Sequence, residues 1–240
     1  MEQLQSRVEA RDLTRAEVQQ AVSTVFLAKV FNWMAVGLGI TGLIALSMDT
    51  LGFTRVIAAS PLFWMLLIGE VGLVFYLAAR IEKLEPGTAT GLFIGYSVMN
   101  GITLSVLFLM YSGASIAGTF LITAGMFAAM AVYGLVTKRD LSGMGSFLFM
   151  GLIGVLLASI VNIFLQSSSL YWAVSLIGVF VFIGLTAYDV QRIKQIGEQG
   201  IMDQGEAAIQ KGAIMGALAL YLDFINLFIL LLRFFGGARD

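Results

Sequence analysis

Residues 212–235 read GAIMGALALYLDFINLFILLLRFF, and this stretch decides the fold class. The segment is 24 residues long and holds only two charged residues, Asp223 and Arg233. A helix needs about 20 predominantly apolar residues to cross the hydrocarbon core of a bilayer. The segment therefore predicts a membrane-spanning helix with a carboxyl group near its middle.

Six further apolar runs of similar length precede this segment. None alternates with the period of two that is typical of a membrane barrel strand. Because lipid cannot satisfy backbone polar groups, helices are the structure that remains. The sequence predicts an all-α integral membrane protein, a bundle of seven transmembrane helices within residues 26–236, with spans at about 27–48, 62–79, 89–110, 114–136, 144–165, 170–188 and 212–235.

The composition excludes a soluble domain and several kinds of active site. Hydrophobic residues make up 59% of the chain, charged residues 12%, and the mean hydropathy is +0.91. Soluble domains carry roughly a quarter charged residues. The chain has no cysteine and no histidine, which excludes disulfides, thiol nucleophiles, a Ser-His-Asp triad and the usual zinc and haem ligands. We expect no resident cofactor, no enzymatic activity and no nucleic-acid partner.

Three segments flank or interrupt the spans. Residues 1–25 form a polar tail without the apolar core of a secretory signal, and we expect this tail to be exposed. Residues 190–211 contain GEQGIMDQGE and are expected to form a long, mobile, solvated loop. Residues 237–240 are expected to be a short terminal segment.

The distribution of lysine and arginine predicts the orientation of the chain in the membrane. Cytoplasmic segments carry an excess of these residues. With the N-terminus in the cytoplasm and the C-terminus outside, eleven basic residues lie on the inner side: Arg7, Arg11, Arg15, Lys29, Arg80, Lys83, Lys138, Arg139, Arg192, Lys194 and Lys211. Three lie on the outer side: Arg55, Arg233 and Arg239.

Three acidic residues fall inside or at the end of predicted spans. Glu70 and Asp223 lie near the middle of the second and seventh spans, and Asp189 closes the sixth. A charge at the bilayer centre costs about 2.5–3.5 kcal/mol on insertion scales, so such groups face the bundle interior and have partners. For Glu70 and Asp223 the alternatives are a functional role or a structural hydrogen bond. Asp189 is equally consistent with a solvated acid beside Arg192.

Small residues follow one face of the seventh span. Gly212, Gly216, Ala219 and Asp223 are spaced by four, three and four residues and therefore share a face. Asn226 and Arg233 continue near that side. This stripe is typical of either a pathway or a packing seam.

Two Gly-x-x-x-Gly pairs, Gly91 with Gly95 and Gly212 with Gly216, are expected to allow close helix packing within the bundle. A dimer interface is the alternative for both pairs.

Two buried acids in contact have a recognisable chemistry. They share a proton and titrate as one coupled unit. When both are ionised they repel each other and offer hard oxygen ligands that suit Ca²⁺. An acid pair inside a bundle is therefore a candidate pH-sensitive gate on a cation path.

The sequence resembles the Bax inhibitor-1 family of membrane proteins. The resemblance is carried by residues 220–236 (LYLDFINLFILLLRFFG) and 184–194 (GLTAYDVQRIK). Residues 115–142 and 152–164 are similar to its bacterial branch, and the similarity extends over all seven spans. It implies a bundle in which six helices surround a central seventh. It also implies that an aspartate pair, here Asp189 and Asp223, acts as pH sensor, gate and transient Ca²⁺ ligand.

The resemblance also assigns expectations to other polar residues. The family's acid in the second helix corresponds to Glu70, and a basic residue that pairs with the gate corresponds to Arg80, one residue out of register. Together with Asn226 and Arg233, these are candidate pathway or gate partners.

The resemblance implies a pH-sensitive calcium leak channel of the bacterial plasma membrane, with Ca²⁺ as the permeant ion. The alternative is a stress-survival protein without transport activity that regulates a membrane-bound AAA protease through its N-terminal tail.

Two further classes fit the sequence less well. An intramembrane aspartyl protease needs a Gly-x-Gly-Asp element, whereas Asp223 follows Leu220, Tyr221 and Leu222. A proton-coupled antiporter would suit buried acids, but the sequence shows no inverted repeat and no pair of helices broken by glycine or proline.

Overall fold

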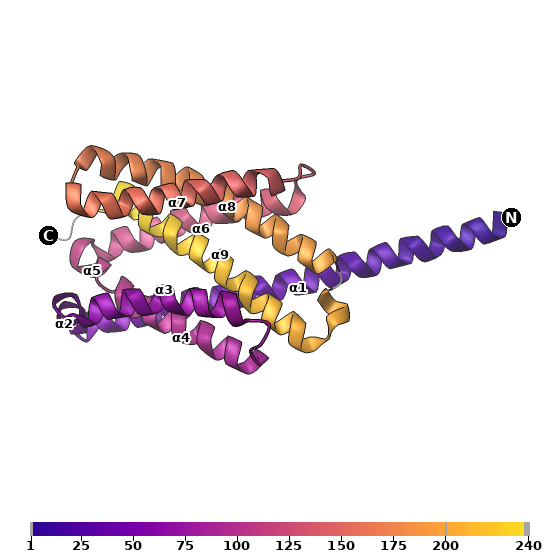
Figure 1. The fold of residues 1–240 in the computed structure, drawn as a ribbon, viewed down its shortest axis with the longest axis horizontal. Coiled ribbons are helices and arrows are strands. Elements are labelled where there is room, and N and C mark those ends of the chain that lie inside the picture. Colours follow the sequence, from indigo (N-terminus) through magenta and orange to yellow (C-terminus); the bar gives the residue numbers. More distant parts are fainter. Residues whose placement is uncertain (1, 200, 238–240) are drawn as a thin grey trace.

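The computed structural model describes residues 2–199 and 201–237. Within these residues every regular element is a helix (Figure 1). The elements are α1 Glu2–Thr50, α2 Phe53–Ala59, α3 Leu62–Arg80, α4 Pro86–Leu104, α5 Leu107–Met110, α6 Gly113–Val136, α7 Ser142–Leu165, α8 Ser168–Glu198, the 3₁₀ helix η1 Ile201–Gln204 and α9 Glu206–Phe235.

The prediction of seven spans in an all-helical protein is confirmed. The described residues contain seven helical segments long and apolar enough to cross a membrane, and each overlaps one predicted span. The third span is built from α4 and the short α5. Local chemistry sets several ends: Pro86 occupies the first turn of α4, and the hydroxyl groups of Ser112 and Ser167 cap α6 and α8.

The expected long loop at residues 190–211 is wrong. Helix α8 continues to Glu198, η1 occupies Ile201–Gln204, and α9 begins at Glu206, with Gly205 at a φ of 87° before it. The hydropathy falls beyond residue 188, but Gln, Arg, Lys, Glu and Ala are good helix formers in water. The helices therefore extend past the apolar segments that the sequence marked.

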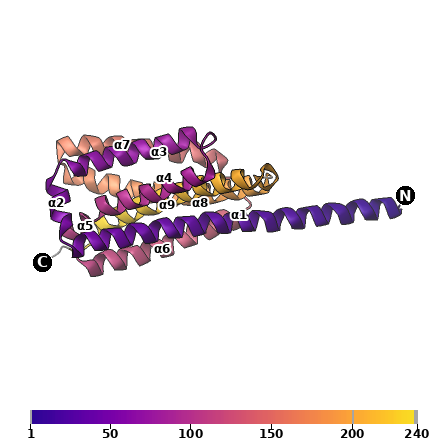
Figure 2. The ribbon, with the colours of Figure 1, turned by 90° about the horizontal axis from the view of Figure 1, so that it is seen from below.

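The N-terminal tail is also helical and is continuous with the first span. Helix α1 is 49 residues long, and at 1.5 Å per residue such a helix measures roughly 70 Å, about twice the hydrocarbon thickness. Figures 1 and 2 show its N-terminal half projecting alone from one end of the bundle. The first 22 residues contain neither glycine nor proline, the residues that most disfavour a helix.

Helix α9 is the most buried of the seven spans. In its most apolar window 72% of residues are buried, against 11% in α3 and in α7. It packs against α1, α4, α6 and α8 and runs diagonally across the bundle in Figure 1. The lipid-facing surface lies on the less buried helices, where large side chains such as Ile68 and Phe147 are exposed.

The two Gly-x-x-x-Gly pairs behave differently. A Cβ atom at Gly216 would lie 3.1 Å from Val30 of α1, and one at Gly212 would lie 2.5 Å from Ile201. This pair therefore packs within the bundle, and the small-residue stripe of α9 is a packing seam at these two positions. A Cβ atom at Gly91 or Gly95 would meet no atom within 4 Å. The prediction that this pair allows close packing within the bundle is therefore wrong.

Candidate functional site

The structure brings Asp189 and Asp223 together. Asp189 lies on α8 and Asp223 on α9, two helices that pack along each other. Their carboxyl groups lie close enough to interact with each other. Asp223 is only 5% exposed, and Asp189 is half-buried. The two acids that the resemblance pairs thus lie near each other, and their role as pH sensor and gate stays a prediction.

A hydrogen bond between these two acids requires a proton. Two ionised carboxylates have only acceptor atoms and repel each other, so one carboxyl must carry a hydrogen to join the pair. No N–H or O–H group of the described residues reaches Oδ2 of Asp223. The basic residue whose charge acts on Asp189 is Arg192, one helical turn further along α8. A hydrogen bond between Asp189 and Asp223 therefore forms only when at least one of the two carboxyl groups is protonated.

Glu70 forms a second polar cluster, separate from the acid pair. Its carboxylate accepts hydrogen bonds from Asn100 Nδ2 at 3.1 Å and from Thr103 Oγ1 at 2.8 Å, both on α4. Asn100 Oδ1 in turn accepts from the hydroxyl group of Tyr221 at 3.0 Å. Tyr221 shares a hydrogen bond of 2.6 Å with Thr41 of α1. All five side chains are buried.

This cluster links four helices through polar side chains. Its members lie on α1, α3, α4 and α9, and Tyr221 is two residues before Asp223. We refer to Glu70, Asn100, Thr103, Tyr221 and Thr41 as the Glu70 cluster. Because hydrocarbon offers no alternative partners, these bonds fix the relative position of the helices.

The other predicted partners lie away from the acid pair. Asn226 donates its side-chain amide to the carbonyl of Leu222 one turn earlier at 2.7 Å. Arg80 is exposed in the last turn of α3. Arg233 lies in the last turn of α9 and donates to Ser175 Oγ at 3.1 Å. The described contacts place none of these three side chains on Asp189 or Asp223.

Sequence reasoning missed the partners of Glu70, although a signal was present. Tyr96, Asn100 and Thr103 are spaced by four and three residues within one span and so share a helix face. A polar face inside an apolar span indicates a buried polar neighbour. Searching for uncharged polar residues with this spacing, and not only for charges, would have found α4 as the helix facing Glu70.

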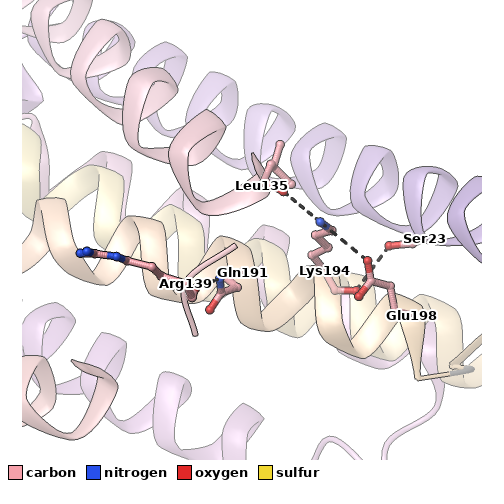
Figure 3. Close-up of polar contacts among 6 residues, drawn as sticks. All are labelled: Ser23, Leu135, Arg139, Gln191, Lys194 and Glu198. Carbon is pink, nitrogen blue, oxygen red and sulfur yellow. Dashed lines mark hydrogen bonds and ion pairs between the residues drawn. The ribbon is translucent and has the colours of Figure 1, made fainter. Parts of the chain in front are cut away.

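The connection between α6 and α7 is fixed by one buried amide. Gln191 of α8, drawn with Arg139 in Figure 3, donates to the carbonyl of Arg139 at 2.8 Å. Its side-chain oxygen accepts from the backbone N–H of Leu141 at 2.8 Å. Hydrogen bonds from Ser142 hold the pKa of Asp140 below its usual range and order the start of α7.

Lys194 lies one turn further along α8 and joins three helices. Its ammonium group donates to the carbonyl of Leu135 at 2.9 Å and lies 3.8 Å from Glu198 (Figure 3). Its own carbonyl accepts from the hydroxyl group of Ser23 at 3.4 Å. The end of the bundle beyond the acid pair is therefore ordered by side chains of α8.

The acid pair offers oxygen ligands but no complete metal cage. Ca²⁺ takes six to eight oxygen ligands in a stable site. The described residues contain no group of three or more acidic, histidine or cysteine residues placed to hold a metal ion.

These features define a polytopic α-helical membrane protein with a buried carboxyl pair between its last two spans. Residues 23–240 match the family model described as inhibitor of apoptosis-promoting Bax1. The chain belongs to the Bax inhibitor-1 family.

Bacterial relatives match nearly the whole chain. The inner membrane protein YbhL of Escherichia coli K12 is 50% identical over 216 residues, which cover 89% of this chain and 92% of the relative. An uncharacterized protein of Borreliella burgdorferi is 43% identical over 95% of this chain and 99% of the relative. An uncharacterized protein of Rickettsia prowazekii is 44% identical over 90% of each.

Proposed function

We propose that this protein is a pH-sensitive calcium leak channel of a bacterial inner membrane, gated by the pair Asp189 and Asp223. The observation that carries the proposal is the contact between two carboxyl groups on neighbouring helices, one of them almost fully buried. The name of the Escherichia coli relative supports the inner membrane as its location. The distribution of basic residues supports a cytoplasmic N-terminus and an external C-terminus.

The gate follows from the charge of the pair. With a proton between the carboxyl groups, α8 and α9 are tied at Asp189 and Asp223, and the path is closed. Loss of that proton leaves two negative charges in contact, which repel each other strongly where water is scarce. The helices then separate locally, and the two carboxylates become oxygen ligands for a passing Ca²⁺. The proposal therefore predicts that flux rises as pH rises.

The test is Ca²⁺ entry into liposomes that contain the purified full-length protein. A Ca²⁺-sensitive dye inside the liposomes reports entry, with internal and external pH set equal at values between about 6 and 8, the range in which a shared-proton gate has physiological use. Flux that increases with pH supports the proposal. No flux above that of protein-free liposomes at any of these pH values would exclude a leak channel.

The projecting half of α1 favours a second candidate function, contact with another membrane protein. A helix that extends alone beyond the bundle offers its whole circumference to a partner (Figures 1 and 2). The partner that we propose is a membrane-bound AAA protease, which this protein would regulate by binding it. Transport and regulation by contact are compatible, since they use different parts of the chain.

Deleting residues 2–20 separates the two functions. We expect the shortened protein to lose co-purification with the protease while it keeps Ca²⁺ flux, because the seven spans begin only at Ser23. The full chain with Asp223→Asn is the reciprocal control and should keep the protease. Retained co-purification after the deletion would contradict the role of the tail.

A further inference from the structure

A recess lies at the opposite end of the bundle from the α6–α7 connection. It has a volume of about 260 Å³ and is formed where α7 ends, α8 begins and α9 ends. We call it the α7–α9 recess. Its lining residues are Ser159, Asn162, Ile163, Tyr171, Val174 and Arg233.

The lining of the recess includes one positively charged side chain, that of Arg233, and no acidic side chain. The guanidinium group of Arg233 lies 4.7 Å above the ring of Tyr171, and its Nη1 donates to Ser175 Oγ at 3.1 Å. Among the residues that the structure describes, no carboxylate forms an ion pair with Arg233. Arg233 is half-buried. A half-buried guanidinium without a counter-ion indicates a site for an anion.

Aromatic residues place this recess at the level of the lipid head groups. Tyr171 and Trp172 begin α8, and Trp172 packs on Phe234 of α9 with 4.9 Å between ring centroids. Tryptophan and tyrosine gather where a bilayer meets water.

The other lining residues suit a phospholipid better than a free phosphate ion. Ile163 and Val174 supply an apolar wall, and Ile163 is 62% exposed toward the side on which lipid lies. Asn162 uses its Oδ1 to accept the backbone N–H of Ser167 at 3.0 Å, which leaves its amino group as a donor. An apolar wall beside a cation and an amide donor matches a phosphodiester joined to acyl chains.

We propose that the α7–α9 recess binds the phosphate group of an anionic phospholipid. Arg233 supplies the charge, Asn162 supplies a hydrogen-bond donor, and the acyl chains run along the apolar surface of α7 beyond Ile163. The site is distinct from the acid pair and from the Glu70 cluster, and it does not depend on whether the protein conducts Ca²⁺.

The experiment is native mass spectrometry of the full-length protein in detergent, titrated with dioleoyl phosphatidylglycerol. We expect one phosphatidylglycerol molecule to bind with higher affinity than dioleoyl phosphatidylcholine. Arg233→Gln should weaken that affinity roughly fivefold, the change that follows from one interfacial basic residue. The matched control Arg55→Gln removes an exposed charge from α2 outside the recess and should leave the affinity unchanged.

Asn162→Asp provides a second variant in case Arg233→Gln does not fold. The aspartate keeps the acceptor for Ser167 and adds a negative charge to the recess, so phosphatidylglycerol should bind more weakly. Equal binding by the wild type and both folded variants would overturn the proposal. Displacement of the lipid by millimolar inorganic phosphate would also overturn it, because the site would then take a free anion.

Discussion

Asp223→Asn is expected to remove the pH dependence of Ca²⁺ flux. An asparagine at this position cannot ionise, and its amide donates to the carboxylate of Asp189, so the contact between α8 and α9 persists at every pH. Flux at the high end of the pH range should fall by about tenfold or more. A tenfold fall corresponds to stabilising the closed state relative to the open state by about 1.4 kcal/mol. Asp189→Asn should act in the same direction, because an amide then faces Asp223. Liposome flux as a function of pH is the measurement.

The control for these variants lies on the same helix. Glu206 is exposed in the first turn of α9, so Glu206→Gln also removes one carboxylate from α9 but leaves the pair intact. Its flux should keep the pH dependence of the wild type. If Asp223→Asn conducts with an unchanged pH profile, the acid pair is not the sensor.

The seven spans could be predicted because lipid imposes a length and a composition on each of them. The ends of the helices could not be predicted in the same way, because a helix can continue beyond the apolar segment that crosses the membrane. Helix α8 passes Asp189 by nine residues and ends at Glu198, in a segment whose polar residues favour helix in water. Hydropathy alone marks the membrane boundary and not the end of the helix.

The acid pair shows where a single sequence stops being informative. Asp223 was recognisable as a buried carboxyl group from its position within one apolar run. For Asp189 the sequence leaves a solvated acid and a functional acid equally open, and only the family resemblance pairs it with Asp223. Contact between two helices depends on the rotation of α8, which its own pattern does not fix. The pairing of the acids with Arg80 of α3 likewise depends on how the helices are rotated. In the structure, the basic residue whose charge acts on Asp189 is Arg192.

Glu70→Leu is expected to destabilise the protein more than Glu70→Gln. Leucine leaves Asn100 Nδ2 buried without an acceptor, whereas Thr103 keeps an acceptor in the carbonyl of Asn100 at 3.0 Å. An orphaned buried amide costs about 1–3 kcal/mol. Thermal unfolding in detergent should show a Tm roughly 2–12 °C lower at that cost for a chain of this size. Glutamine keeps the acceptor for Asn100 and should cost much less.

A second substitution distinguishes an orphaned partner from a simple packing defect. Replacing Asn100 with leucine in the Glu70→Leu background removes the unsatisfied amide, while Tyr221 keeps its bond to Thr41. Removing both partners of a buried hydrogen bond is much less costly than removing one. The Tm of the double variant should therefore be higher than the sum of the two single effects predicts. Strictly additive losses would mean that Glu70 contributes volume alone, and the Glu70 cluster would not couple α3 to α9.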